Sequence, residues 1–322
     1  MKMRFLLDIL LGESHIASPL LSASALEGEE ETYELSLTPN AHSKSSHTIV
    51  DVPSYQKIVL DPSLKSVKTL TSSLYPGFFI NLRAYDSFDS YFEKHFSGQG
   101  RRRNFSRQSK RLENEVHPQR RIFHGAVDNP TLTLLFDRLK IFLEKRFDQK
   151  EAYNYEVPLL PLYKQMFGKL LPKKNAIIFS LFDGDKVIAL GIGFIHGKTL
   201  YLFNIAFDVD YARYGLGNQM MIDVVNWCFD NNIAQIDMGR GDFLHKRQWV
   251  NSTYTYTQIN LYDPKKPNSI FKAYGSWTLN SVRYHLINFL KKLKVHQLAK
   301  VLLLWRYRAK NRLNTKNVDP HP

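Results

Sequence analysis

Residues 175–219 read NAIIFSLFDGDKVIALGIGFIHGKTLYLFNIAFDVDYARYGLGNQ, and this stretch decides the fold. Three apolar segments, 176–182, 186–195 and 199–207, are separated by two short turns at 183–185 and 196–198. Both turns contain glycine, and the first also contains aspartate; these residues tolerate the backbone angles that short hairpin loops need. The pattern therefore predicts an antiparallel meander of three strands.

A glycine-rich turn follows the third predicted strand. It reads YARYGLG at residues 211–217, and it precedes a predicted helix at 218–230 and a short predicted strand at 234–238. Glycine lets a backbone approach phosphate closely, and the N–H groups and dipole at a helix N-terminus favour an anion there. The order predicts an α/β fold with a mixed sheet, in which the meander is followed by a strand–helix–strand unit that carries a phosphate site.

Three motifs, taken in order, resemble one known family. They are RRNFSRQSKRL at residues 102–112, DVDYARYGLG at 208–217 and DMGRGDFLHKR at 237–247. Together they frame about half of the chain and resemble the GNAT acyltransferase superfamily. Within it the chain looks like the CelD-like bacterial branch, which is related to the Fem-type aminoacyltransferases. One position departs from the superfamily pattern, because Ala212 stands where Gln or Arg is usual and Arg213 follows one residue later.

The resemblance implies a domain organisation. It implies a GNAT-like acyltransferase domain at residues 119–265. Before it, residues 1–118 would form a reduced second GNAT-like half with a basic helix, and after it residues 266–322 would form a basic helical tail. Within the first region, residues 27–54 are rich in Ser, Glu, Thr and His, and they predict loops and marginal strands.

The resemblance also implies a reaction. The expected activity is transfer of an acyl group, most simply acetyl, from acetyl-CoA or another acyl-CoA to an amine or hydroxyl of a cell-surface polysaccharide or glycolipid precursor. No metal is expected. Two alternatives stay open. One is a Fem-like transferase that uses aminoacyl-tRNA, and the other is a non-catalytic protein that binds a membrane surface or nucleic acid on a degenerate acyltransferase fold.

The expected acyl-CoA site has two parts. The backbone N–H groups after the glycine turn would hold the pyrophosphate, and they belong to Gly215, Leu216, Gly217 and Asn218. The Arg213 side chain is a further candidate ligand for this group. The resemblance implies that pantetheine pairs with the third strand of the meander near Phe203 and Ile205, where an N–H would stabilise an oxyanion.

The expected acceptor site follows the strand at 234–238. Asp242 is the candidate catalytic residue, because it lies just past the carboxyl end of a strand, where α/β sheets place ligand chemistry. Proton transfer, orientation of the acceptor and capping of a helix at 243–249 all stay open as roles for Asp242. Arg240 and Lys246 are candidate substrate ligands, and other acid–base candidates are Glu156, Asp208, Tyr254 and Tyr256.

The positive charge of the chain is local. The formal net charge is +14, of which residues 101–121 carry +6 and residues 269–316 carry +11, so the remainder is −3. Two basic surfaces with anionic partners explain this distribution better than a uniformly basic domain does. In the tail, apolar residues at helical spacing alternate with cations from Leu286 onwards, and this pattern suits an anionic membrane surface. A helix packed on the domain and a nucleic-acid partner are the alternatives.

Composition also bounds the location of the chain. The single cysteine, Cys228, is expected to be a buried structural thiol and precludes an internal disulfide. The apolar amino terminus imitates a signal peptide, but Asp8 interrupts its apolar run. No apolar run approaches the roughly 18 residues of a membrane-spanning helix. We therefore expect a cytoplasmic protein that associates peripherally with the inner face of the membrane.

Overall fold

The computed structural model describes residues 2–6, 24–27, 30–35, 46–60, 66–149, 151 and 156–293. The chain divides into two compact units, one made of Met1–Asn81 with Asp237–Phe289 and the other of Leu82–Ile236 with Leu290–Pro322. Each unit is described by itself. The predicted tail beyond residue 293, with its apolar residues at 298–305, lies outside the described residues.

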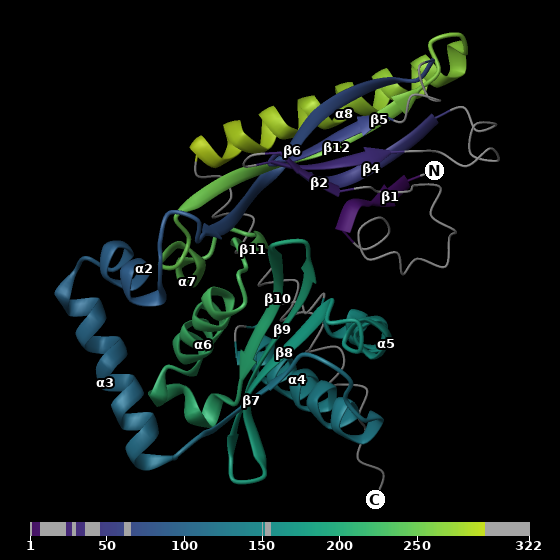
Figure 1. The fold of residues 1–322 in the computed structure, drawn as a ribbon. Coiled ribbons are helices and arrows are strands. Elements are labelled where there is room, and N and C mark those ends of the chain that lie inside the picture. Colours follow the sequence, from purple (N-terminus) through teal and green to yellow (C-terminus); the bar gives the residue numbers. More distant parts are fainter. Residues whose placement is uncertain are drawn as a thin grey trace, which may run out of the picture. The chain divides into compact units, whose positions relative to one another are not determined.

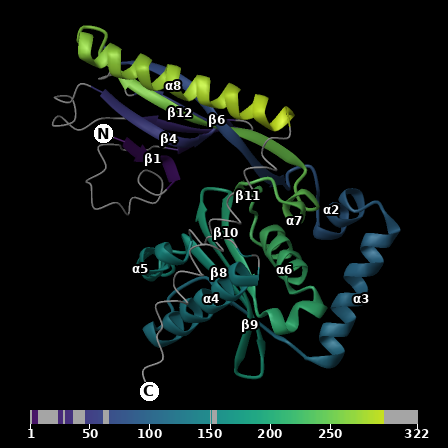
Figure 2. The same ribbon diagram turned by 180° about the vertical axis from the view of Figure 1, so that it is seen from behind.

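The second unit contains the predicted meander. Its strands β8 (Ala176–Asp183), β9 (Lys186–His196) and β10 (Thr199–Phe207) pair in antiparallel order, and β7 (Gln119–Phe123) pairs with β8 at the edge. Helix α6 (Leu216–Asp230) covers one face of these strands, while α4 (Asn129–Gln149) and α5 (Leu160–Leu170) cover the other (Figures 1 and 2). Because both faces are covered, the three strands are apolar along almost their whole length. The predicted meander is confirmed.

Helix α4 shows how the sequence specifies a helix that packs on the sheet. Asp128 caps it, since its carboxylate accepts hydrogen bonds from the Thr131 N–H at 2.7 Å and the Thr131 hydroxyl at 3.0 Å. These bonds lower the pKa of Asp128. Apolar side chains at helical spacing turn towards the sheet and are buried, namely Leu132, Leu135, Phe136, Leu139, Phe142 and Leu143.

The first unit is built around five neighbouring strands. In spatial order they are β1 (Lys2–Arg4), β4 (Ser46–Pro53), β12 (Ser252–Tyr262), β6 (Lys68–Asn81) and β11 (Gln235–Arg240), of which the part from Asp237 onwards belongs to this unit. β1 is parallel to β4, and β12 is antiparallel to both β4 and β6. A separate small sheet joins β2 (Ser24–Glu27), β3 (Glu30–Leu35) and β5 (Gln56–Leu60). Helices α2 (Phe88–His95) and α3 (Gln99–Glu115) open the second unit after β6.

Helix α8 (Pro267–Lys292) lies along this sheet (Figure 2). The Gln258 side-chain amide donates to the Ser276 hydroxyl at 2.7 Å, and the Trp277 indole N–H donates to the Thr71 carbonyl at 3.0 Å. The tail is therefore helical as predicted up to Lys292, and one side of it is fixed on β12 and β6.

The sequence predicted less strand structure in the first unit than the structure shows. Residues 27–54 predicted marginal strands, but β4 is an interior strand in which Ile49 and Val52 are buried. Likewise β6 is a long strand of 14 residues. Both strands contain many polar residues, so neither shows a clear apolar pattern in its sequence. Pairing with neighbouring strands holds β4 and β6 in the sheet instead.

Candidate functional site

The glycine loop, residues 208–217, connects β10 to α6. It contains the 3₁₀ helix η4 (Val209–Tyr214), whose N-cap Asp208 accepts from the Asp210 N–H at 3.3 Å. The Asp208 carboxylate is almost fully buried and bonds the Lys186 ammonium at 2.9 Å. Gly215 has a φ of 64°, in the left-handed region that glycine adopts without strain, and α6 starts at the next residue. An ion pair at one end and a left-handed glycine at the other thus fix the loop.

Two of the four predicted amides are engaged inside this loop. The Gly215 N–H donates to the Ala212 carbonyl at 3.1 Å, and the Asn218 N–H donates to the Gly215 carbonyl at 2.9 Å. Within the described residues, the N–H groups of Leu216 and Gly217 donate to no protein acceptor. They lie at the positive end of a 15-residue helix, so they fit a pyrophosphate oxygen. Binding of pyrophosphate by these two amides stays a prediction.

Helix α3 packs against the glycine loop, a contact that the sequence did not predict. The side chain of Gln108 lies beside Gly215, where an added Cβ would meet its Oε1 at 2.3 Å. Within the part of the chain that the structure describes, the buried Gln108 Oε1 and Gln219 Nε2 have no hydrogen-bond partner. Arg213 bonds the Tyr214 hydroxyl and lies 3.2 Å from the Glu115 carboxylate. Its role as a phosphate ligand stays a prediction.

A β-bulge marks the predicted pantetheine strand. In the pairing of β10 with β9 the register shifts between Leu202 and Asn204, so Phe203 is the extra residue. The Phe203 ring packs on Phe194 at 4.8 Å, and the Ile205 carbonyl accepts from Arg146 Nη1 at 3.1 Å. Bulges bend a strand and occur often beside ligand sites. Pairing of Phe203 and Ile205 with pantetheine stays a prediction.

The first unit contains a buried carboxylate cluster, which consists of Asp237, Tyr55, Tyr254 and the Gly239 N–H. The Tyr254 hydroxyl lies 2.8 and 2.7 Å from the two Asp237 oxygens, and the Tyr55 hydroxyl donates to Oδ2 at 2.7 Å. The Gly239 N–H donates to Oδ1 at 2.6 Å. Asp237 is only 2% exposed.

The burial of Asp237 sets its protonation. Burial raises the pKa of this carboxyl above its ordinary value of 3.8, while the hydrogen bonds from Tyr254, Tyr55 and Gly239 oppose part of that rise. A carboxyl with a raised pKa is a better proton acceptor near neutral pH than an exposed one. Burial likewise raises the pKa of Tyr254, so its hydroxyl stays protonated and donates to Asp237.

Close aromatic packing positions the cluster. The Tyr254 ring lies directly on Gly77, where an added Cβ would come within 2.2 Å of its Cζ. The Tyr55 ring meets Tyr254 edge-on at 5.0 Å, and Phe79 lies 5.6 Å from Tyr55. These rings leave the two hydroxyls little freedom, so both stay directed at Asp237.

The predicted acceptor residues lie in the loop after β11. Asp242 is partly exposed and forms a bidentate ion pair with Arg247. The short helix α7 (Leu244–Arg247) has no side-chain cap, so Asp242 does not cap it. Lys246 donates to the Met238 carbonyl and to the Arg240 carbonyl at 2.8 Å, and thereby holds the turn. The Arg240 guanidinium lies over the Tyr75 ring at 5.6 Å.

Sequence reasoning missed Asp237 and Tyr55 as functional candidates. An acid between Ile236 and Met238 in an apolar strand is a signal that could have singled out Asp237, because such a carboxyl must be hydrogen-bonded when buried. No local signal marks Tyr55, which lies 182 residues away in sequence. Tyr254 was predicted as an acid–base candidate, and it does contact the buried carboxylate.

One family model matches part of the chain. Residues 99–247 match the family model for the acetyltransferase (GNAT) domain. No curated protein matches the chain.

Several solved structures are similar in part. FemX has a TM-score of 0.45 with 9% identity and covers 75% of this chain and 83% of its own. L-PGS from Bacillus licheniformis has a TM-score of 0.41 with 10% identity, over 79% and 83% of the two chains. A conserved protein of unknown function from Bacteroides thetaiotaomicron VPI-5482 has a TM-score of 0.43 with 9% identity, over 76% and 83%. At these values nothing about activity follows from the likeness. What the comparisons establish is that residues 99–247 are similar to GNAT acetyltransferase domains.

Proposed function

We propose that this protein is an acyl-CoA-dependent N- or O-acyltransferase. The observation that carries the proposal is the pair of unengaged amides, Leu216 and Gly217, at the start of α6 within a segment that matches the GNAT domain. The favoured donor is acetyl-CoA, and the favoured acceptor is an amine or hydroxyl on a cell-surface polysaccharide or glycolipid precursor. In this proposal residues 119–265 form the transferase domain.

Calorimetric titration with acetyl-CoA, a long-chain acyl-CoA and aminoacyl-tRNA tests the donor. Acetyl-CoA is expected to bind, and incubation with an acceptor is expected to release one free CoA thiol for each acyl group transferred. Binding of aminoacyl-tRNA without CoA binding would instead favour the Fem-like alternative.

The chain's own residues supply binding and proton transfer in this scheme. The donor supplies an activated acyl thioester, and the two amides at the start of α6 donate hydrogen bonds to its pyrophosphate. In the first unit, the Tyr55 hydroxyl can take a proton from an acceptor and pass its own proton to Asp237. The C–S bond breaks as the bond from the acceptor to the acyl carbon forms; the CoA thiolate takes a proton from solvent, and Asp237 returns one proton to solvent. We propose that Asp242, Arg240 and Lys246 orient the acceptor beyond β11.

The variant Asp242→Asn tests the proposed orientation role. It keeps the size of the side chain but weakens the ion pair with Arg247, so we expect kcat to fall about tenfold while the Kd for acetyl-CoA stays within twofold. Steady-state kinetics and calorimetry measure the two quantities. Arg247→Gln is the matched variant, because it breaks the same pair from the other side. Unchanged kcat in Asp242→Asn would assign Asp242 to loop structure alone.

A second proposal concerns the partner of α8. Its outward face and the residue that follows it, Leu293, carry large apolar side chains that are each more than half exposed; those on the helix are Phe271, Leu279, Val282, Leu286 and Phe289. From Leu279 on they recur every three or four residues, and residues 269–316 contain eleven Lys or Arg and no acid. An exposed apolar stripe among cations suits the headgroup region of an anionic bilayer. No helix in the described ranges is long and apolar enough to cross a membrane.

Co-sedimentation with phosphatidylglycerol vesicles tests this partner. The variant Leu286→Glu is expected to reduce pelleting at least fivefold, whereas His285→Glu, which adds the same charge beside the stripe, should reduce it about twofold. Raising the salt concentration should weaken the binding of vesicles by the unmodified protein and by both variants. The Debye length shortens from about 8 Å at physiological ionic strength to about 3 Å at 1 M, so lipid charges are screened. Equal pelleting of both variants would remove the apolar stripe from the proposal.

A further inference from the structure

Helix α3 has one face that is fixed and one that is open. On the fixed face Phe105 and Leu112 are buried, and the Phe105 ring packs on Phe92 and Phe96 at 5.8 and 5.1 Å. Gln108 lies on the glycine loop, and Glu115 accepts from the Tyr214 hydroxyl at 3.0 Å. These contacts fix which side of α3 packs against the protein, and they therefore also fix which residues of α3 face away from it.

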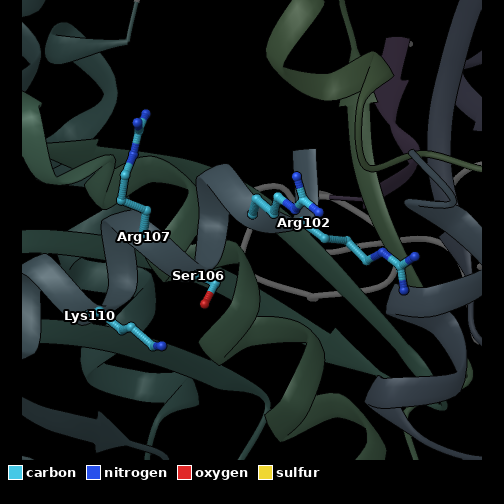
Figure 3. A pocket seen from close by; sticks show the side chains of 5 residues that line it. Arg102, Ser106, Arg107 and Lys110 are labelled. Atoms are coloured by element: carbon cyan, nitrogen blue, oxygen red, sulfur yellow. The ribbon is translucent and has the colours of Figure 1, made fainter. Parts of the chain in front are cut away.

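The exposed side of α3 carries a shallow, open basic pocket. A pocket of about 580 Å³ is lined by five side chains that we call the basic stripe, namely Arg102, Arg103, Ser106, Arg107 and Lys110 (Figure 3). Their spacing places them on one side of the helix, along about 12 Å of its length. The Arg107 guanidinium is steadied by the Asn104 side-chain oxygen at 3.0 Å.

The charges of the stripe do not stabilise the helix. The first turn of α3 contains no acid, so the arginines at its start oppose the helix dipole. Arg107 and Lys110 are three residues apart, where side chains are neighbours and like charges repel. Among the described residues no carboxylate lines the pocket. The two acids of α3 are paired elsewhere, since Glu113 bonds Arg120 at 2.7 Å and Glu115 bonds Arg111 at 2.9 Å. An anionic ligand would relieve this repulsion.

The lining indicates the chemistry of the ligand. Guanidinium groups bind phosphate through two parallel N–H donors, and the Ser106 hydroxyl adds another donor. The described lining holds no aromatic ring on which a nucleobase could stack. The nearby rings of Phe92, Phe96 and Phe105 pack on one another instead. Four cations and one hydroxyl in the described lining suit a single phosphate or diphosphate group.

We propose that the basic stripe binds the phosphate or diphosphate group of a small phosphorylated acceptor. This assignment rests on the proposed acyl transfer, because it names the class of molecule that receives the acyl group. The stripe points away from the face of α3 that carries Gln108, which lies on the glycine loop. The acceptor phosphate and the pyrophosphate of CoA are therefore assigned to different residues.

Calorimetric titration of the full chain with inorganic pyrophosphate, in saturating CoA and low salt, tests the proposal. Saturating CoA occupies the glycine loop, so the remaining binding reports the stripe. Arg107→Gln and Lys110→Gln are each expected to weaken pyrophosphate binding at least fivefold. The matched control is Arg101→Gln, which removes the same charge from an exposed position of α3 outside the pocket, and it should change binding less than twofold.

Several outcomes would overturn the assignment. Equal losses in Arg107→Gln and Arg101→Gln would show a general charge effect with no built site. Binding of phosphatidylglycerol vesicles or of poly(U), but not of pyrophosphate, that is lost in Arg107→Gln would assign the stripe to a macromolecular surface. Acetyl-CoA affinity is measured on the same proteins and should be the same in all of them. Absence of CoA binding in the unmodified protein would reject the proposed acyl transfer, while the comparison of pocket and control variants still decides the phosphate site.

Discussion

Gly217→Pro is expected to lower the affinity for acetyl-CoA at least tenfold, which corresponds to about 1.4 kcal/mol. Gly217 is the second residue of α6, and its N–H is one of the two amides that no protein acceptor engages within the described residues. Proline is tolerated in the first turn of a helix, where its missing N–H breaks no helical hydrogen bond. The substitution therefore removes one phosphate donor while α6 is retained.

Gly217→Ala is the matched control for this prediction. An added Cβ would meet the Phe207 ring at 3.4 Å, an ordinary contact, and the N–H remains in place. Its CoA affinity should stay within about twofold of the unmodified protein. Calorimetry measures the Kd, and circular dichroism checks the fold of both variants. Equal CoA binding by folded Gly217→Pro and Gly217→Ala proteins would place the donor site elsewhere.

Gly215 would make a poorer test of the same site. Its φ of 64° strains any other residue, and a Cβ there would collide with the Gln108 side chain. A substitution at Gly215 would thus displace α3 as well as the loop, and a loss of binding could not be assigned to the amides.

Local patterns predicted what depends on neighbours in sequence. The strands of the meander follow from alternating turns and apolar runs, and the start of α6 follows from its glycines. Contacts between distant residues were not predictable in this way. Neither the position of Gln108 on Gly215 nor the hydrogen bond from Tyr55 to Asp237 leaves a mark on the adjacent sequence.

In the candidate site too, the sequence predicted local motifs but not contacts between distant residues. The motif in the sequence identified Gly217 and Leu216. The hydrogen bonds that the Gly215 and Asn218 amides donate within the loop became apparent only in the folded structure. Asp242 drew attention because it is a charged residue past a strand end, and it proves to be paired with Arg247. Asp237, inside the same strand, is the acid whose burial perturbs its pKa. Burial depends on packing across β6, β12 and β4, which periodicity in one strand does not reveal.

Asp237→Asn is expected to lower kcat for acetyl transfer at least 100-fold, within the range of about 10² to 10⁴ that a general base contributes. Asparagine preserves the shape of the side chain and can still accept from one tyrosine hydroxyl, but it cannot take a proton. The Kd for acetyl-CoA should stay within about threefold, because the proposed phosphate donors are the amides of Leu216 and Gly217. Single-turnover kinetics and calorimetry separate the two quantities.

The pH profile distinguishes proton transfer from a structural role of Asp237. Only the ionised carboxylate accepts a proton, so kcat should fall as the pH drops through a pKa that burial has raised above 3.8. The hydrogen bond from Tyr55 favours the ionised form and lowers that pKa, so Tyr55→Phe should move the acidic limb to higher pH besides slowing turnover. Asp237→Asn should abolish the limb. A limb that stays unchanged in both variants would show that another group accepts the proton, and the carboxylate cluster would then only stabilise the end of β11.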